Sequence, residues 1–300
     1  MKHIITTILL SLLALASCSN TEKTEATDTN MPTPTNDSLT FKSGYSDVNG
    51  IKMYYEIYGE GKPLVLIHGG GSTIQTSFGR VIPLFSKDRQ LICVELQAHG
   101  RTGDRNAELS FEQDADDVAA LLKNLNIDKA DVLGFSNGGN TALQMAIRHP
   151  EVCNNIVAAS VLLKRDGTFP QFWAFMENGT FDQMPQQYKD AYLSVNPDSA
   201  KLLNMFHKCA YRMVHLQDFP DAQIKSIQAP VLLINGDADV ATNEHVVAMS
   251  KLIPNCRLAI IPGGHGAYIG EITTLKKDYK DTDFIVPLIE NFLNGDYVKK

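Results

Sequence analysis

Residues 130–140 read "ADVLGFSNGGN", so an apolar run leads directly into a cluster of Gly, Ser and Asn. Such a run is typical of a buried strand, and such a cluster is ordinary turn material. The pattern G-x-S-x-G at 134–138 also fits a sharp strand-to-helix turn that exposes a serine hydroxyl. Ser136 is therefore a candidate nucleophile, which requires a histidine, an acid and oxyanion donors elsewhere in the chain.

Short apolar runs alternate with amphipathic stretches along most of the chain. The apolar runs predict strands at 52–58, 63–71, 89–96, 130–135, 155–163, 230–236 and 257–264. The amphipathic stretches predict helices at 110–126, 137–150, 243–253 and 283–293. Because strands that alternate with helices form sheets covered on both faces, we expect an α/β fold with a mostly parallel central sheet.

The interval 164–229 interrupts this alternation. It is rich in Phe, Tyr, Met and Gln and contains no strong strand pattern. We interpret it as a helical lid insertion over one end of the sheet. Its aromatic residues are expected mostly to pack against one another, with a minority facing a pocket; they include Phe169, Phe172, Trp173, Phe175 and Tyr188.

Side chains suited to acid–base and nucleophilic chemistry follow three of the predicted strands. Ser136 follows one strand, Asp237 and Asp239 follow a second, and His265 follows a third. Binding sites of open α/β sheets lie at the carboxyl ends of the strands, so we expect these side chains to come together. Their order along the chain is Ser, Asp, His, which is the order of the α/β-hydrolase triad.

Five motifs in the matching order make the chain resemble an α/β-hydrolase of the lidded, single-domain esterase type over roughly residues 45–295. The motifs are "HGGG" (68–71), "VELQAHGRT" (94–102), "GFSNGG" (134–139), "INGDAD" (234–239) and "IPGGHG" (261–266). The second motif departs from the family pattern D-x-R-G-H-G-x-S at Glu95, Gln97, Ala98 and Thr102. These departures affect the inferred substrate more than the inferred reaction.

The resemblance implies an oxyanion hole built from backbone N–H groups. Asn137 directly follows the nucleophile and supplies the first donor. Gly70, near the end of an earlier strand, supplies the second, with Gly71 as the alternative. Two such donors would stabilise the negative charge that develops on a carbonyl oxygen during attack by Ser136.

The base and the acid are chosen from several candidates. Of eight histidines, His265 occupies a Gly-bounded loop after the last core strand, whereas His68 and the histidines of the insertion are alternatives. The family pattern G-x-x-D places the acid three residues after Gly236, at Asp239. Asp237 is the alternative acid, and Glu95 is a weaker third candidate.

The N-terminus reads "MKHIITTILLSLLALASCSN". Its apolar run of about thirteen residues is shorter than the roughly twenty that span a bilayer, and it follows the layout of an export signal. Residues 15–18, "LASC", resemble a bacterial lipobox. We therefore expect a signal peptide at 1–17 and acylation of Cys18, which would anchor the protein to a membrane of the bacterial cell envelope. A buried N-terminal helix with an incidental cysteine is the alternative.

Residues 18–40 contain almost nothing apolar beyond Cys18, so we expect a flexible tether that precedes a folded domain at 41–300. The formal net charge of −7 argues against nucleic acid as a partner. The remaining cysteines show no metal-ligand spacing; they are Cys93, Cys153, Cys209 and Cys256. The chemistry inferred here requires neither a metal nor an organic cofactor.

These features predict a serine hydrolase that cleaves a small to medium, partly apolar ester or lactone. A serine at position 136 argues against the haloalkane dehalogenases and epoxide hydrolases of this fold, which carry Asp there. The same triad would also serve a thioesterase, a peptidase or a C–C bond hydrolase, and a non-catalytic ligand-binding lipoprotein is an alternative of another class. The natural substrate and the oligomeric state stay open.

The lipobox leads to a prediction about membrane attachment. Wild-type protein should partition with the membrane fraction of its native host, because acyl chains on Cys18 bury hydrocarbon in the bilayer. The Cys18→Ala variant should mature abnormally and lose this attachment, as measured by fractionation and mass spectrometry of the N-terminus. A wild-type chain that is wholly soluble and cut at another position would contradict the anchor.

Overall fold

The computed structural model describes residues 39–276 and 278–296. The predicted signal peptide, the acylation of Cys18 and the tether up to residue 38 lie outside the described residues. No helix of the described residues is long and apolar enough to cross a membrane.

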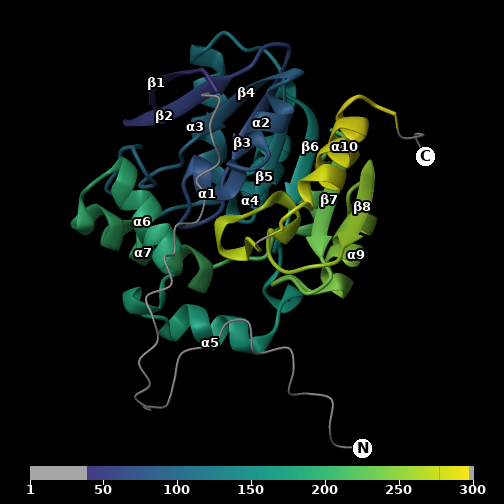
Figure 1. Cartoon of the computed structure of the whole chain (residues 1–300). Helices are drawn as coiled ribbons and strands as arrows, with labels where there is room; N and C mark the ends of the chain where they lie inside the picture. The colour runs from purple at the N-terminus through teal and green to yellow at the C-terminus, as the bar shows by residue number, and fades with distance from the viewer. Residues whose placement is uncertain (1–38, 277, 297–300) are drawn as a thin grey trace, which may run out of the picture. The chain divides into compact units, whose positions relative to one another are not determined.

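The described strands form one eight-stranded sheet in the order β1-β2-β4-β3-β5-β6-β7-β8 (Figure 1). Their bounds are β1 Phe41–Val48, β2 Ile51–Tyr58, β3 Lys62–Ile67, β4 Arg89–Val94, β5 Ala130–Phe135, β6 Cys153–Ala159, β7 Val231–Gly236 and β8 Cys256–Ile261. The pairs β1–β2 and β2–β4 are antiparallel, and the others are parallel. The predicted α/β fold class is confirmed.

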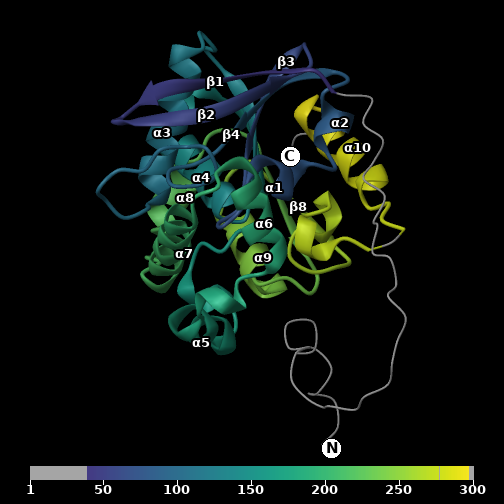
Figure 2. The same cartoon turned by 60° about the vertical axis from the view of Figure 1, so that its left-hand side comes forward.

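Helices cover both faces of the sheet. Figure 2 shows α3 (Phe111–Asn124) and α4 (Asn137–Arg148) on one side and α2 (Ile82–Phe85) and α10 (Thr282–Leu293) on the other. The remaining helices outside the predicted insertion are α1 (Ile74–Phe78) and α9 (Asn243–Leu252). The core of the sheet accordingly forms two apolar clusters, one on each face, and a smaller third cluster lies among residues of the predicted insertion and Ala98.

Alternation along each strand divides its side chains between the two clusters. In β3, Val65 and Ile67 join the cluster beneath α3 and α4, whereas Leu64 and Leu66 join the cluster beneath α1, α2 and α10. Because both faces are buried, the strand reads as a continuous apolar run rather than as alternating apolar and polar residues. This explains why such runs predict the central strands.

The first hairpin is not predicted by the apolar runs. Strand β1 is mostly exposed and lacks an apolar run, so it escapes a search for buried strands. Asn49 and Gly50 have φ angles of +43° and +89°, and Val48 pairs with Ile51. An Asn-Gly pair between two strands is typical of a tight two-residue hairpin turn, so the signal is present in the sequence.

Helices fill the interval between β6 and β7. They are α5 (Pro170–Asn178), α6 (Gln186–Val195), α7 (Ser199–Val214) and α8 (Asp221–Ser226), with short 3₁₀ turns η2 (Arg165–Gly167) and η3 (Phe181–Gln183) before and between them. The side chains of α8 and α7 attach this segment to the body. Ile224 of α8 belongs to the core cluster beneath α3 and α4, and Arg212 of α7 forms a buried ion pair of 2.7 Å with Asp114 of α3.

Arg89 joins the sheet to the last helix. Its side chain is 2% exposed and forms ion pairs of 2.8 Å with Asp131 of β5 and with Glu290 of α10. Removing one partner of a buried ion pair leaves the other charge unpaired in an apolar environment, which is strongly destabilising.

Arg89→Ala should therefore lower the free energy of unfolding by about 3–5 kcal/mol, measured by urea denaturation. Lys52→Ala is the matched control because Lys52 and Asp47 form an ion pair whose side chains are 69% and 81% exposed. The control should change the free energy of unfolding by less than about 1 kcal/mol. Equal effects of the two substitutions would contradict a structural role of the buried pair.

Candidate active site

Ser136 lies in a strained turn between β5 and α4. Its φ of +54° and ψ of −121° are unusual for a residue with a side chain and cost about 1–3 kcal/mol. Backbone hydrogen bonds hold this conformation. The N–H of Ser136 donates to the carbonyl oxygen of Ala159 at 2.8 Å, and the carbonyl oxygen of Ser136 accepts from the N–H groups of Gly139 and Asn140.

The glycines on either side of Ser136 allow close backbone packing. A Cβ atom at Gly134 would lie 2.0 Å from the carbonyl oxygen of Gly138, and one at Gly138 would lie 2.1 Å from that of Ile67. Neither contact can be relieved by rotating a side chain, because both involve backbone atoms. The G-x-S-x-G pattern is therefore a packing requirement of the turn that exposes the Ser136 hydroxyl.

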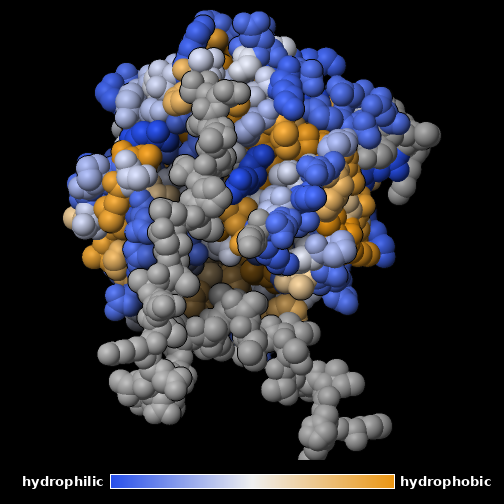
Figure 3. All heavy atoms as spheres, viewed as in Figure 1, coloured by the Kyte–Doolittle hydropathy of each residue, from blue (hydrophilic) through white to orange (hydrophobic). Residues whose placement is uncertain are grey.

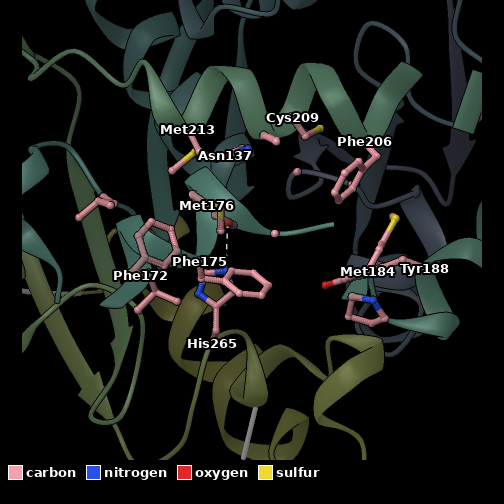
Figure 4. A pocket seen from close by; sticks show the side chains of 18 of the residues that line it. Asn137, Phe172, Phe175, Met176, Met184, Tyr188, Phe206, Cys209, Met213 and His265 are labelled. Atoms are coloured by element: carbon pink, nitrogen blue, oxygen red, sulfur yellow. Dashed lines mark hydrogen bonds between the residues drawn. The ribbon is translucent and has the colours of Figure 1, made fainter. Parts of the chain in front are cut away.

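Ser136, His265 and Asp239 form a continuous chain of contacts. The Nε2 atom of His265 lies 3.0 Å from Ser136 Oγ, and its Nδ1 atom lies 2.6 Å from Asp239 Oδ1. The dashed line in Figure 4 runs to the imidazole of His265 and marks the first of these contacts. Because a carboxylate only accepts, Nδ1 carries the proton and Nε2 is free to accept the hydroxyl proton of Ser136.

Asp239 is buried and has further donors. Its Oδ2 atom accepts from Ser160 Oγ at 2.6 Å and from the N–H of Gly236 at 3.1 Å. Burial alone would raise the pKa of Asp239, but the facing His265 and these hydrogen bonds hold it below the usual range. Asp239 therefore stays charged and can stabilise a protonated His265 imidazole.

The pKa of His265 is raised. Burial opposes the charged imidazole, but the charge of Asp239 and its hydrogen bond outweigh burial, and the charge of Glu271 adds to them. A base with a raised pKa holds a proton taken from a serine hydroxyl more readily.

Asp237, the alternative acid, has a different position. Its side chain accepts from the N–H of Gly263 at 2.8 Å, and the residue is exposed. It thus ties the loop after β7 to the loop that carries His265. The structure brings Asp239, rather than Asp237, to His265.

Asn137 and Gly70 lie side by side next to Ser136. Asn137 is the first residue of α4, and a Cβ at Gly70 would lie 2.3 Å from Asn137 Nδ2. Both residues line the pocket that contains Ser136, and no residue of the described chain accepts a hydrogen bond from either N–H. The N–H of Gly71 instead donates to His99 Nε2 at 3.0 Å. The donor that remains available in this loop is therefore that of Gly70.

His68 and His99 support the turn that contains Gly70. His68 Nε2 accepts from the N–H of Leu96, and its Nδ1 lies 2.7 Å from the carbonyl oxygen of Gly69. Burial lowers the pKa of His68 to about 4 and that of His99 well below its usual value. Both rings are neutral near pH 7, and their bonds hold the loop rather than Ser136.

The Ser136 hydroxyl opens into a cavity of about 280 Å³. Figure 4 shows side chains of the β6–β7 segment around it. The segment contributes Phe172, Phe175, Met176, Met184, Tyr188, Met205, Phe206, Cys209 and Met213. Among the described residues that line the cavity there is no Lys, Arg, Asp or Glu. The site is therefore an apolar pocket with a few polar groups at its base.

More aromatic residues of the insertion face this pocket than the sequence suggests. Phe172, Phe175 and Tyr188 line the cavity, whereas Trp173 donates to the carbonyl oxygen of Arg165. Helix α5 has no buried residue; its Phe172 packs partly against the core cluster beneath α3 and α4 and also lines the pocket. Phe169 and Phe175 are also about half exposed. Figure 3 shows hydrophobic and hydrophilic residues interspersed over the visible face of the molecule.

Residues 62–216 match the sequence model of the family described as the alpha/beta hydrolase fold. The chain belongs to this family. A fluoroacetate dehalogenase from a Burkholderia species is 23% identical over 75% of this chain and 88% of its own length. A 2-hydroxymuconate semialdehyde hydrolase from Pseudomonas sp. strain CF600 is 35% identical, over 36% of this chain and 39% of its own length.

The enol-lactonase from Burkholderia xenovorans LB400 has a similar fold, with a TM-score of 0.64 and 20% identity. The likeness covers 84% of this chain and 100% of that one. These relatives are hydrolases of one superfamily, and we therefore treat this α/β-hydrolase as an enzyme whose bond specificity is open.

Ser160, which touches the triad of this α/β-hydrolase, and Tyr268, which touches Ser160, escape sequence analysis. Ser160 Oγ donates to Asp239 and lies 2.8 Å from the hydroxyl of Tyr268. Ser160 has a φ of +55° and stands just after β6, although the apolar run predicts a strand that continues to residue 163. Ser160 would have been selected as a residue that follows a strand if β6 had been predicted to end at Ala159.

The unusual second motif forms part of the scaffold. Glu95 is fully buried and forms an ion pair of 2.7 Å with Arg101, which also pairs with Glu56 at 3.1 Å. The side chains of this motif do not line the cavity. Within the described residues no three His, Cys, Asp or Glu side chains come together as a metal-ligand set.

The two aspartates lead to a prediction. Asp239→Asn should lower the rate of p-nitrophenyl acetate hydrolysis by about 10⁴-fold, because an amide donor facing Nδ1 favours the wrong imidazole tautomer. Asp237→Asn should lower it by less than about tenfold, since Asp237 holds only the loop. The reverse ranking would assign the acid role to Asp237.

Proposed function

We propose that this α/β-hydrolase cleaves uncharged, partly apolar carboxylic esters or lactones through an acyl-enzyme on Ser136. The observation that carries the proposal is the chain of contacts from Ser136 through His265 to Asp239, which opens on an apolar pocket beside two available N–H donors. The reaction needs no group beyond these residues and water.

Acylation uses the contacts that are already in place. Ser136 Oγ attacks the substrate carbonyl carbon while His265 Nε2 takes its proton. Asp239 keeps Nδ1 protonated and stabilises the imidazolium. The N–H groups of Asn137 and Gly70 hold the carbonyl oxygen as it becomes negative, and loss of one such donor costs about 3 kcal/mol.

Collapse of the tetrahedral intermediate breaks the bond to the leaving oxygen, which receives the proton from His265. In a lactone, the leaving alcohol stays attached to the acyl group. A water molecule then attacks the acyl carbon while His265 takes its proton, and the second collapse returns that proton to Ser136 Oγ. The enzyme is restored and the acid is released.

The pocket supports apolar substrates. Four methionines line it, Met176, Met184, Met205 and Met213, and flexible thioether side chains adapt to acyl groups of different shape. A carboxylate on the substrate would meet no Lys or Arg among the described lining residues. Leaving an anion unpaired in such a site is costly, which favours uncharged esters.

A C–C bond hydrolase is the second candidate. It is favoured by the 35% identity, over 112 residues, to a hydrolase named for 2-hydroxymuconate semialdehyde. That compound bears a carboxylate, and the cavity offers this group no cationic side chain among the described lining residues. We therefore rank ester or lactone cleavage first.

The sequence also supports a proposal on location. With Cys18 acylated and residues 18–40 as a tether, the domain at 41–300 would act from the surface of an envelope membrane. The β6–β7 segment, 164–229, would be the lid through which substrate enters.

Substrate class can be tested with p-nitrophenyl esters of rising acyl length. We expect kcat/KM to increase about fourfold per methylene until the pocket is filled, which corresponds to about 0.8 kcal/mol for each buried methylene. The hemisuccinate ester, a charged analogue of the butyrate ester, should be at least about tenfold slower.

Ser136→Ala is the control and should abolish both hydrolysis and labelling by an alkyl fluorophosphonate. A hemisuccinate that outperforms the uncharged series would refute the apolar substrate class. Turnover of 2-hydroxymuconate semialdehyde with no turnover of any ester would favour the C–C bond reaction.

A further inference from the structure

A second buried carboxylate, that of Glu271, lies beside His265 but outside the triad. Glu271 is 1% exposed and stands six positions after His265, between η4 (Ala267–Ile269) and η5 (Ile272–Thr274). Its Oε2 atom accepts from the N–H of Thr273 at 2.9 Å and from its hydroxyl at 2.5 Å. Its Oε1 atom is buried and receives no hydrogen bond from any described residue. A buried carboxylate of this kind can take another donor at little cost.

Helix α6 of the β6–β7 segment packs against η5, the turn that Glu271 caps. Tyr188, on α6, lines the pocket, and its hydroxyl lies close enough to Glu271, Ser72 and Thr273 for each of them to affect its pKa. Burial, followed by the charge of Glu271, raises the pKa of Tyr188 well above its usual value. The hydroxyl therefore keeps its proton and can donate it in a hydrogen bond.

The loop that contains Glu271 also fixes His265. Gly266 has a φ of +72°, and a Cβ there would lie 2.6 Å from Phe135 Cζ and 2.8 Å from Glu271 Cβ. The N–H of Glu271 donates to the carbonyl oxygen of Gly266 at 3.2 Å. Glu271 therefore packs directly against Gly266, the residue next to His265.

We propose that Glu271 and Tyr188 form a positioning pair that fastens α6 to the His265 loop and holds the pocket wall over Ser136. In this pair the Tyr188 hydroxyl is the proposed donor for Glu271 Oε1, the buried oxygen for which the structure shows no hydrogen bond from a described residue. The same carboxylate favours the protonated form of His265. The inference rests on the proposed function, since it requires His265 to act as the base for Ser136.

The charges around His265 make the pair testable. Asp239 faces the imidazole from the loop after β7, and Glu271 faces it from its own loop, whereas the turn after β5 contributes the uncharged Phe135 and Ser136. Both carboxylates raise the pKa of His265. His265 must be neutral to accept the serine proton, so activity falls as pH falls through its pKa. Removing the charge of Glu271 should therefore move this acid limb to lower pH.

The experiment measures the rate constant for labelling of Ser136 by an alkyl fluorophosphonate as a function of pH. Glu271→Gln should move the midpoint of the acid limb down by about half a pH unit or more. Tyr188→Phe keeps the carboxylate and should leave the midpoint within about 0.2 units of wild type. It should instead raise KM for p-nitrophenyl hexanoate several-fold and change kcat by less than about twofold, because the pocket wall is no longer fastened.

Glu60→Gln and Tyr211→Phe are the matched controls, because Glu60 is exposed at the end of β2 and Tyr211 is 46% exposed on α7. Both should behave as wild type.

Absence of labelling in the wild type would overturn the proposed function. Labelling in the wild type with an unchanged midpoint in Glu271→Gln would overturn the positioning pair alone. If Glu271→Gln does not fold, an unchanged KM in Tyr188→Phe would overturn it.

Discussion

The close approach of α4 to the end of β3 is the constraint on which the site depends. With only a hydrogen at Gly138, the first turn of α4 lies against the carbonyl oxygens of Ile67 and His68. This contact places Asn137 beside Gly70 at the pocket, and Ser136 has a positive φ and lines the same pocket. The proposed nucleophile and the proposed oxyanion donors thus depend on one packing contact, which no side chain at position 138 could preserve.

Sheet register supplies the rest of the triad. Gly236 at the end of β7 pairs with Ile261 at the end of β8, so the loops after these two strands begin side by side. Asp239 is three residues into the first loop and His265 is four residues into the second, and Nδ1 and Oδ1 meet at 2.6 Å. Because β7 is buried on both faces, it cannot slip in register without exposing apolar side chains. The geometry is therefore fixed by the core rather than by the loops themselves.

Local pattern in the sequence predicts the features that depend on neighbouring residues alone. Buried strands read as apolar runs, so β5 is predicted at its observed bounds and Ser136 with it, whereas the exposed β1 is missed. Two aspartates come after β7, and local pattern alone does not decide which of them is the acid of the triad. That choice depends on which carboxylate contacts His265, a residue that lies 26 positions after Asp239. Glu271 cannot be found in this way. The role proposed for Glu271 depends on a contact with α6. This helix belongs to the insertion, whose packing cannot be predicted from a hydrophobic period in the sequence.

The residues proposed for catalysis and the residues of the pocket wall come from parts of the chain that pack differently. The groups proposed for catalysis follow β5, β7 and β8. Strands β5 and β7 are entirely buried in a close-packed core, and β8 is held in register by pairing with β7. The pocket walls come from the β6–β7 segment, where α5 has no buried residue and where Met184 and Met205 belong to a small apolar cluster apart from the two clusters of the sheet. Substitutions in these walls can change the shape of the cavity without moving Ser136, His265 or Asp239. Reaction class and substrate range can therefore change separately, and a polar contact between α6 and the His265 loop is one of the few places where a wall residue can act on the chemistry itself.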